Sequence, residues 1–276
     1  MRSFLFNFLF FFSLILALPG CETLTNSNNS KSDEYSELSA EQLHVKAKSA
    51  MKAENYKKAI KLYETLESRY PFGDYAAQTQ LNIAYAYYKN DDPETAIAAT
   101  DRFIKINPRH PNVDYAYYLK GLINYNRSIG FLERFLPTDS SQRNPTNVKE
   151  AFDNFELLTR RFPNSKYAPD AKQRMIALKN NLAMYEVHVA RFYLKRKAYI
   201  AAANRGSYVV KNYQRTPAVP YALQVMEKAY TKLGMDVLAA DAKRVYQQNY
   251  PDGPPVIQQR ETTFLDKTWE LFGFDE

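Results

Sequence analysis

Small apolar residues recur along this chain at a fixed distance before a proline. In four segments the distance is twelve residues, and the pairs are Ala59 with Pro71, Ala96 with Pro108, Ala151 with Pro163, and Ala239 with Pro251. A fifth copy is centred on Ala202 and has Gln214 in the place of the proline. Because a proline cannot continue a helix, each copy predicts a helix that ends just before the proline.

A second set of positions lies twelve residues before these alanines and predicts a partner helix. These positions are Ala47, Ala84, Ala190 and, as the one large residue, Glu227. Small residues at this spacing let two helices approach closely, as in the tetratricopeptide repeat (TPR). The pattern therefore predicts an all-α fold, a right-handed TPR-like helix-pair solenoid of five repeats.

The third copy departs from the regular spacing. The distance from Gly121 to Ala151 is thirty residues instead of twelve. This difference predicts an inserted loop at 127–146 between the two helices of that repeat. The repeats thus divide into an N-terminal group at 35–126 and a C-terminal group at 147–252.

The fourth copy is extended before its first small position. From Pro169 to Lys197 apolar residues follow one another at helical spacing, and neither glycine nor proline occurs after the start. This stretch predicts one long helix at about 169–197, in place of the short helices expected elsewhere.

The chain begins with an apolar run from Phe4 to Leu18 behind Arg2. The run is too short for a comfortable membrane span and is typical of a signal peptide, at 1–20. It ends in Leu-Pro-Gly-Cys, with the chain's single cysteine at Cys21. This end resembles the bacterial lipobox, although Pro19 stands where such motifs carry a small residue. A cysteine that falls here by chance in an ordinary signal peptide is the alternative.

The lipobox resemblance implies that Cys21 is a lipidation site, with a diacylglycerol on its sulfur and an acyl chain such as palmitate on its new amino group. Several acyl chains together anchor a protein stably. Glu22, rather than the aspartate of an inner-membrane retention signal, follows the cysteine. We therefore expect the chain to be anchored through lipid in the inner leaflet of the outer membrane, at its periplasmic face.

Two further segments flank the repeats. Residues 21–34 are mostly small and polar, as in a flexible tether. The tail at 253–276 follows Pro254-Pro255 and has apolar residues at helical spacing, among them the only tryptophan, Trp269. The pattern indicates an amphipathic helix that either caps the last repeat or contacts a partner or membrane surface.

The amino-acid composition argues against several classes of function. The eight glycines stand singly, so no glycine-rich phosphate-binding loop is present. The net charge of +7 comes without a run of five basic residues, so we expect no nucleic acid partner. The 22 tyrosines and 17 phenylalanines favour packed helices and aromatic surfaces over disorder.

The sequence also lacks the residues for common catalytic sites. The three histidines, His44, His110 and His188, are far apart, and no paired cysteines occur. We expect no metal site, no catalytic residue and no cofactor apart from the covalent lipid on Cys21, so the protein is not expected to be an enzyme. A murein-cleaving lipoprotein is the enzymatic alternative.

The first helix of each repeat lines the concave side of such a solenoid. In the N-terminal repeats the inward positions are rich in tyrosine and include Lys48, Tyr85, Tyr88 and Tyr118. Tyrosine offers apolar contact at low entropic cost, and Lys48 or Lys52 could meet a negative charge. The surface suits an extended peptide with aromatic side chains and a terminal carboxylate. Packing between repeats is the other interpretation of these tyrosines.

Several segments of the repeats carry a resemblance to a known family. They are Arg69-Tyr-Pro-Phe-Gly73, Gln80–Asn90, Asp101–Ile104, Asn107–Asn112 and Asn204-Arg205. Together they resemble the BamD family, the TPR lipoproteins of the outer-membrane β-barrel assembly (Bam) complex, from about residue 35 to 250. The inserted loop is poorer in charge than is usual in that family, and Gln214 replaces a proline.

The resemblance implies a non-enzymatic adaptor that assists the insertion of β-barrel proteins. Its N-terminal repeats would receive the C-terminal targeting signals of unfolded outer-membrane β-barrel proteins, at positions that include Tyr70, Phe72 and Gly73. Its C-terminal repeats would hold the POTRA domain of BamA, with Arg205 on that face, alongside other Bam lipoproteins.

Two alternatives accompany this implication. A TPR lipoprotein scaffold for pilus or cell-wall assembly would lack the Tyr-Pro-Phe-Gly segment and the long helix. Arg205 could instead serve packing between repeats, which would need an internal acidic partner such as Asp236 or Asp241.

Overall fold

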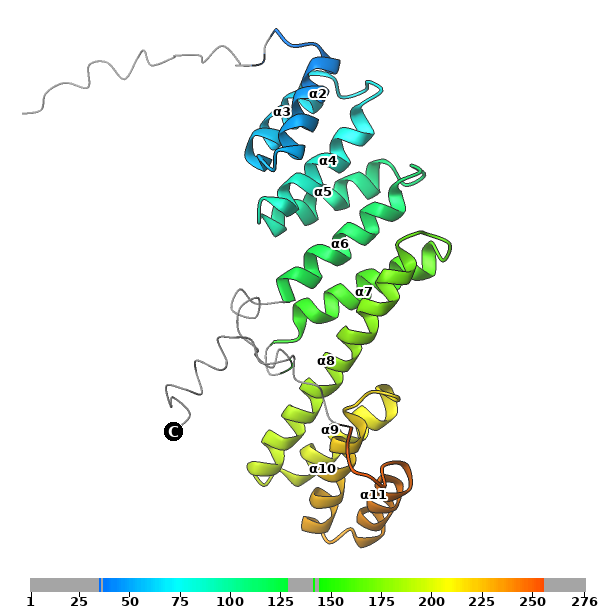
Figure 1. The fold of residues 1–276 in the computed structure, drawn as a ribbon. Coiled ribbons are helices and arrows are strands. Elements are labelled where there is room, and N and C mark those ends of the chain that lie inside the picture. The colour runs from blue at the N-terminus through cyan, green and yellow to red at the C-terminus, as the bar shows by residue number, and fades with distance from the viewer. Residues whose placement is uncertain (1–34, 36, 129–140, 142–143, 256–276) are drawn as a thin grey trace, which may run out of the picture.

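The structure is a computed structural model that describes residues 35, 37–128, 141 and 144–255. Within these residues there are ten α-helices and no strand, and the helices follow one another along an elongated molecule (Figure 1). In chain order the helices are α2 (Ala40–Lys52), α3 (Tyr56–Arg69), α4 (Ala76–Lys89), α5 (Pro93–Ile106), α6 (Val113–Ser128), α7 (Thr146–Arg161), α8 (Ala168–Lys195), α9 (Tyr199–Asn212), α10 (Val219–Lys232) and α11 (Asp236–Asn249).

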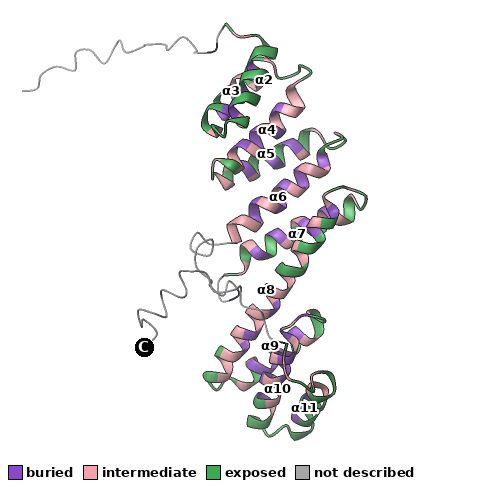
Figure 2. Cartoon of the chain, in the orientation of Figure 1, coloured by how far each residue is buried: buried purple, intermediate pink, exposed green. Residues whose placement is uncertain are grey.

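Each helix packs mainly on the helix before it and the helix after it. The buried residues accordingly lie on the faces where consecutive helices meet, and the outer faces are exposed (Figure 2). Packing restricted to neighbours is the property that defines a solenoid. The predicted all-α helical repeat solenoid is confirmed.

The small residues predicted from the spacing lie at these helix contacts. Ala47, Ala84 and Ala190 are fully buried. Gly121 is buried as well, and a Cβ atom there would lie 2.4 Å from the ring of Phe155 on α7. The position predicted at Glu227 differs, because this residue is partly exposed. In α10 the fully buried small residues are instead Ala222 and Ala229.

The turns within four of the helix pairs share one backbone conformation. Glu54, Asp91, Lys197 and Gly234 each follow the first helix of a pair and have φ values of 57°, 61°, 61° and 70°. A left-handed residue at this place reverses the chain within a few residues. Only one of the four is glycine, so the turn is not visible as a glycine pattern in the sequence.

The ends of the second helices explain the spacing of the prolines. Pro71, Pro108, Pro163 and Pro251 each come directly after the residue that caps α3, α5, α7 and α11, respectively. At the end of α9 the cap is Tyr213 and the next residue is Gln214. Helix α9 is as long as α3, α5 and α11, so the proline is not required for termination.

Helix α8 has 28 residues, against 13 to 16 in the other helices, and its bounds lie close to the predicted 169–197. Its length of about 42 Å follows from the rise of 1.5 Å per residue. Its first part packs on α7, and it also contacts α9 and α10. The helix therefore connects α7 with the later helices α9 and α10.

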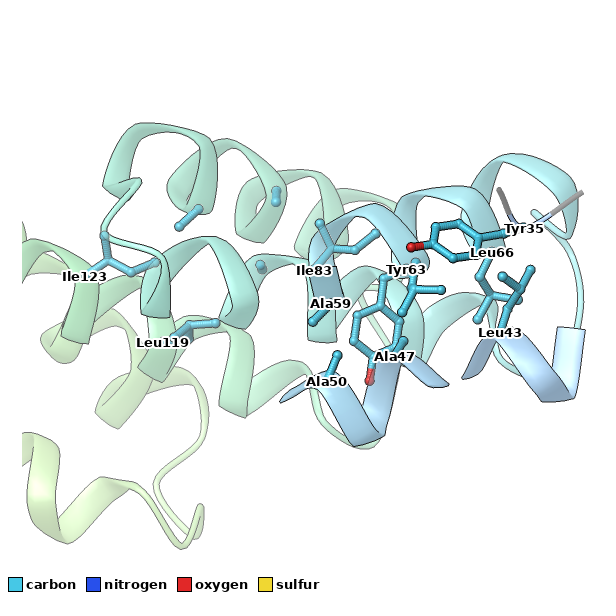
Figure 3. Packing of buried hydrophobic residues seen from close by; sticks show 14 residues of the cluster. Tyr35, Leu43, Ala47, Ala50, Ala59, Tyr63, Leu66, Ile83, Leu119 and Ile123 are labelled. Carbon is cyan, nitrogen blue, oxygen red and sulfur yellow. The ribbon is translucent and has the colours of Figure 1, made fainter. Parts of the chain in front are cut away.

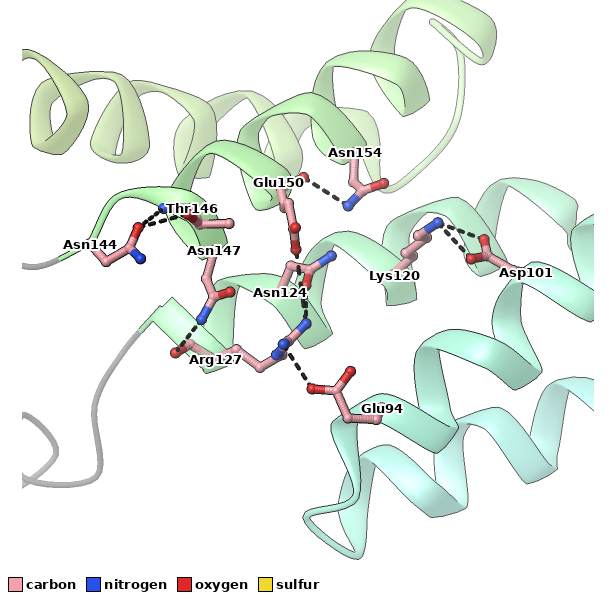
Figure 4. A network of polar contacts seen from close by, with 10 residues as sticks. All are labelled: Glu94, Asp101, Lys120, Asn124, Arg127, Asn144, Thr146, Asn147, Glu150 and Asn154. Atoms are coloured by element: carbon pink, nitrogen blue, oxygen red, sulfur yellow. Dashed lines mark hydrogen bonds and ion pairs between the residues drawn. The ribbon is translucent and has the colours of Figure 1, made fainter.

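The predicted insertion separates α6, which ends at Ser128, from α7, which begins at Thr146. At this junction Arg127 forms ion pairs with Glu94 of α5, at 2.8 Å, and with Glu150 of α7, at 3.9 Å. Its guanidinium also donates to Asn124, at 3.1 Å (Figure 4). One arginine thus links α5, α6 and α7.

The N-terminal core is built around Tyr63, which is almost fully buried and lies next to Ala47 and Ala50 of α2 (Figure 3). The largest fully buried side chains of the next cluster are Phe103 and Phe155. In the two clusters formed by α8, α9 and α10 the buried members are alanine and valine, and partly buried tyrosines, Met184 and Leu194 pack against them. The largest fully buried side chains are therefore concentrated in the first three helix pairs.

Several predicted features lie outside the described residues. They are the signal peptide at 1–20, Cys21, the tether at 21–34, most of the inserted loop and the amphipathic part of the tail. In the part of the chain that the structure describes, no helix combines the length and apolar character needed to cross a bilayer.

Candidate functional site

Six tyrosines lie together on one side of the solenoid. They come from the first helices of three successive helix pairs. We call them the tyrosine surface: Tyr85 and Tyr88 of α4, Tyr115, Tyr118 and Tyr125 of α6, and Tyr167 at the start of α8. All six are partly exposed. Their rings lie close to one another, with centroids 6.2 Å apart for Tyr85 and Tyr88 and 4.8 Å apart for Tyr118 and Tyr167.

A charged pair on the first turns of α8 borders these rings. The Tyr118 hydroxyl donates to the Oδ2 atom of Asp170, at 2.7 Å, and the Nε atom of Arg174 donates to the same oxygen, at 2.6 Å. The guanidinium of Arg174 lies 4.8 Å from the ring centroid of Tyr125. Asp170 and Arg174 are one turn apart on the helix, which brings both side chains to the same face.

The ionisation states of these side chains follow from their burial and from the ion pair of Asp170 and Arg174. Burial and the hydrogen bond to Asp170 raise the pKa of Tyr118 to about 12. Burial, with further contributions from the neighbouring tyrosines, raises the pKa of Tyr115 as well. Although burial opposes its charge, hydrogen bonds from Arg174 and Tyr118 hold the pKa of Asp170 below its ordinary value. Near neutral pH the surface therefore presents neutral phenols and one intact ion pair.

The predicted site residues Tyr85, Tyr88 and Tyr118 are thus brought together, whereas Lys48 is not part of the cluster. Lys48 is exposed on α2, and no hydrogen bond, ion pair or ring contact links it to the tyrosine surface within the described residues. It lies one turn after His44, whose ring stacks on Tyr75 at 4.5 Å. Burial and the charge of Lys48 lower the pKa of His44.

The Tyr-Pro-Phe-Gly segment forms the connection from α3 to α4. Tyr70 caps α3, is half-buried, and has the guanidinium of Arg69 5.4 Å from its ring centroid. Phe72 is 98% exposed and Gly73 is exposed beside it. A phenylalanine that is this exposed buries almost no apolar area and so contributes nothing to the core. It is available for contact with another molecule.

Arg205 lies on α9 and pairs with Glu186 of α8, at 2.8 Å. The side chain of Arg205 is 45% exposed, whereas that of Glu186 is 14% exposed. The sequence suggests Asp236 or Asp241 as an internal acidic partner, and of these Asp241 pairs with Arg244 instead. Arg205 therefore has an internal partner, but its guanidinium still reaches the surface.

Gly206, the residue after Arg205, allows another part of the chain to approach α9 closely. A Cβ atom there would lie 2.6 Å from Cγ of Met226 and 3.0 Å from the carbonyl oxygen of Ala222. Both residues belong to α10. Gly206 thus serves the contact between α9 and α10.

Sequence analysis missed Tyr167, Asp170 and Arg174. The repeat spacing assigns inward positions only on α2, α4 and α6, which are the first helices of the first three pairs. Tyr167, Asp170 and Arg174 lie at the start of α8, in its extended part. The spacing of Asp170 and Arg174, four residues apart on a predicted helix, was the available signal. Only the packing of α8 beside α6 shows that the pair meets the tyrosines.

No group of three or more potential metal-binding side chains gathers within the described residues. The tyrosine surface consists of aromatic rings, neutral hydroxyls and the ion pair of Asp170 and Arg174. Such a surface binds ligands through ring contacts and hydrogen bonds.

Comparison with known proteins places the chain in a family. Residues 36–245 match the YfiO family model, described as outer membrane lipoprotein. The outer membrane protein assembly factor BamD of Neisseria meningitidis serogroup A is 44% identical over 258 residues, which cover 94% of this chain and 93% of the relative. BamD of Vibrio cholerae is 40% identical over 221 residues, which cover 80% of this chain and 92% of the relative.

The match includes all of the described helices except the last few residues of α11, and so it includes the tyrosine surface, the Tyr-Pro-Phe-Gly segment and Arg205. The identity exceeds 30% over more than two thirds of the chain in both relatives. The chain belongs to the BamD family of outer membrane protein assembly factors.

Proposed function

We propose that this protein is a non-enzymatic assembly factor of the Bam complex, which assists the insertion of β-barrel proteins into the outer membrane. The observation that carries the proposal is the similarity to BamD relatives along nearly the whole chain. A solenoid of helix pairs suits this role because it offers a long surface on which two different partners can bind at the same time.

The tyrosine surface and the Tyr-Pro-Phe-Gly segment are the proposed binding region for unfolded β-barrel proteins. The partly exposed rings offer aromatic contacts, and the fully exposed Phe72 adds an apolar contact at the same end of the molecule. Peptides in extended conformation bind such surfaces through side chains that alternate along the strand. Tyr70, Phe72, Gly73, Tyr85, Tyr88 and Tyr118 are the contacts that we propose on this chain.

The C-terminal repeats are the proposed binding region for the POTRA domain of BamA, with Arg205 as a contact. Its guanidinium is exposed, so it can form a second charged contact while it keeps Glu186. Other Bam lipoproteins are the further partners that membership of the complex implies.

We also propose that Cys21 carries the lipid and holds the protein at the periplasmic face of the outer membrane. The support is the lipobox-like sequence before Cys21 and the family description as outer membrane lipoprotein. A tether of polar residues would then separate the anchor from the first helix pair.

Co-purification from detergent-solubilised membranes tests the proposal as a whole. We expect the protein to recover BamA and to cross-link to an outer-membrane β-barrel protein during its synthesis. Recovery of pilus or cell-wall components in place of BamA would favour the scaffold alternative. If neither BamA nor a β-barrel protein is recovered, the proposed function is wrong.

A further inference from the structure

We propose that Arg174 binds the terminal carboxylate of a peptide that ends in an aromatic residue, on the tyrosine surface. This inference rests on the proposed function, namely that the surface receives unfolded β-barrel segments, and it adds the residue that recognises their free C-terminus.

The orientation of Arg174 supports this role. Its Nε atom donates to Asp170, and the ring of Tyr125 lies 4.8 Å from its guanidinium, so the side chain is held from two directions. The two Nη nitrogens carry the other four N–H donors of the group. A guanidinium fixed in this way can meet a carboxylate with two parallel hydrogen bonds, with little further loss of side-chain entropy.

The charge balance of the site also supports it. The Oδ2 atom of Asp170 already accepts hydrogen bonds from Tyr118 and from Arg174. This oxygen is thus bound from two sides, and the pair is close to neutral as a unit. An incoming carboxylate would therefore meet unused donors of Arg174 beside a carboxylate whose charge is largely compensated.

The surroundings distinguish Arg174 from the nearby lysines. The side chain of Arg174 is 29% exposed and borders aromatic rings, and a hydrogen bond to a charged group is stronger where water is partly excluded. Lys48 is exposed, and Lys89 lies over the ring of Tyr56 on another helix. Lys166 is the nearest lysine, with its Nζ atom 5.1 Å from the ring centroid of Tyr167, but its side chain is exposed. Exposed ammonium groups remain hydrated and contribute little.

The position fits a terminal residue with an aromatic side chain. Tyr118 and Tyr125 lie one above the other on α6, and both contact the Asp170 and Arg174 pair. An aromatic side chain placed against these rings would bring its own carboxylate to the guanidinium. Ring contact and carboxylate recognition would thus occur within one residue of the ligand.

The test compares a short fluorescent peptide that ends in phenylalanine with the same peptide amidated at its C-terminus. Binding of both to the full-length protein in detergent is measured by fluorescence anisotropy. We expect the native protein to prefer the free acid by about tenfold, the scale of a hydrogen-bonded pair with a charged group. In Arg174→Gln the preference should disappear, because the acid form loses affinity and the amide form does not.

Three control variants separate this role from others. Lys48→Gln and Lys166→Gln should keep the preference for the free acid. Asp170→Asn should keep it as well, because Arg174 remains. The double variant Asp170→Asn with Arg174→Gln removes both charges together, so that no unpaired partner is left, and it should lose the preference without losing its fold as judged by circular dichroism.

A preference that persists in Arg174→Gln and in the double variant would overturn this inference and leave the proposed function intact. Loss of the preference in Lys48→Gln or Lys166→Gln, with Arg174→Gln unaffected, would overturn it in favour of a lysine. If neither peptide binds the native protein while BamA is still recovered, both this inference and the proposed substrate region are wrong.

Discussion

Gly121 and Gly206 show how a single atom sets the distance between two helices. At Gly121 the ring of Phe155 occupies the space where a Cβ atom would lie, and at Gly206 the side chain of Met226 does so. Phe155 is fully buried in the second core cluster, so its ring has little room to move. Methionine is more adaptable, because its unbranched side chain can change conformation.

The substitution Gly121→Ala is therefore expected to destabilise the protein. Alanine gains about 1 kcal/mol in a helix relative to glycine, but overpacking a fixed core costs about 1 to 3 kcal/mol. We expect a net loss, measured as a lower denaturation midpoint in urea. Gly73→Ala is the matched control, since a Cβ atom there meets only Tyr70 at 3.8 Å. Equal stability of both variants would show that Phe155 can relax.

Three partly buried tyrosines make the stability depend on pH in the alkaline range. Burial is the largest cause that raises the pKa of Tyr87, Tyr118 and Tyr213 from the ordinary 10 to about 12. Between these values the unfolded chain loses protons that the folded chain keeps. The free energy of unfolding therefore falls as the pH rises from 10 to 12, and the stabilisation is fully present below pH 10.

Thermal unfolding across this range, together with the ultraviolet absorbance of tyrosinate, provides the measurement. Tyr118→Phe should show a smaller fall of the melting temperature over the same interval, because one of the shifted groups is gone. A fall of the same size in the variant would mean that Tyr118 titrates normally.

At the scale of elements, α8 is the unusual part. It begins against α6 and α7, where it contributes Asp170 and Arg174, and its later turns pack on α9 and α10, where it contributes Glu186. A change in the bend of this one helix would alter the distance between the tyrosine surface and Arg205. Both proposed binding regions are thus connected by a single continuous helix.

The pair between α8 and α9 distinguishes a scaffold role from a partner role for Arg205. Ion pairs at the surface contribute about 1 kcal/mol or less, and the side chain of Arg205 is 45% exposed, so Arg205→Ala should leave the melting temperature nearly unchanged. We expect it to reduce the recovery of BamA in co-purification. Arg205→Ala combined with Glu186→Gln controls for the carboxylate that would be left without its partner. A large loss of stability with BamA recovery intact would assign Arg205 to the scaffold.

At the scale of the whole molecule, burial is unequal along the solenoid. Helix α7 buries Phe155 and Leu158 completely, whereas α11 buries only two alanines. On the exposed part of α11, Val237 is 76% exposed. Local opening requires less free energy where fewer apolar contacts are lost.

Hydrogen exchange should therefore be slowest in α7 and fastest among the helices in α11. Amide exchange followed by mass spectrometry of the full-length chain measures this order. The expectation reverses if the amphipathic tail caps the last repeat. Strong protection of α11 that disappears when the chain is cut after residue 255 would demonstrate such capping.

The sequence by itself determined the repeat architecture, because the helix contacts depend on side-chain size at a fixed spacing. Ala47 and Ala84 lie in helix contacts, since only small residues allow the helices to approach. The prolines mark the ends of the second helices, because proline cannot donate the next hydrogen bond. The length of α8 follows from apolar periodicity without interruption. These properties depend on residues close together in the sequence, so they can be predicted from the sequence.

Only the tertiary structure decided which residues meet. Tyr118 and Asp170 are 52 positions apart, and their hydrogen bond depends on how α6 and α8 lie beside each other. The inserted loop and the extension of α8 both interrupt the regular spacing, so counting along the repeat could not pair these positions. The same reason explains why Glu186, and not Asp241, is the partner of Arg205. Contacts between helices depend on the rotation of each helix about its axis, which packing determines and the repeat spacing does not specify.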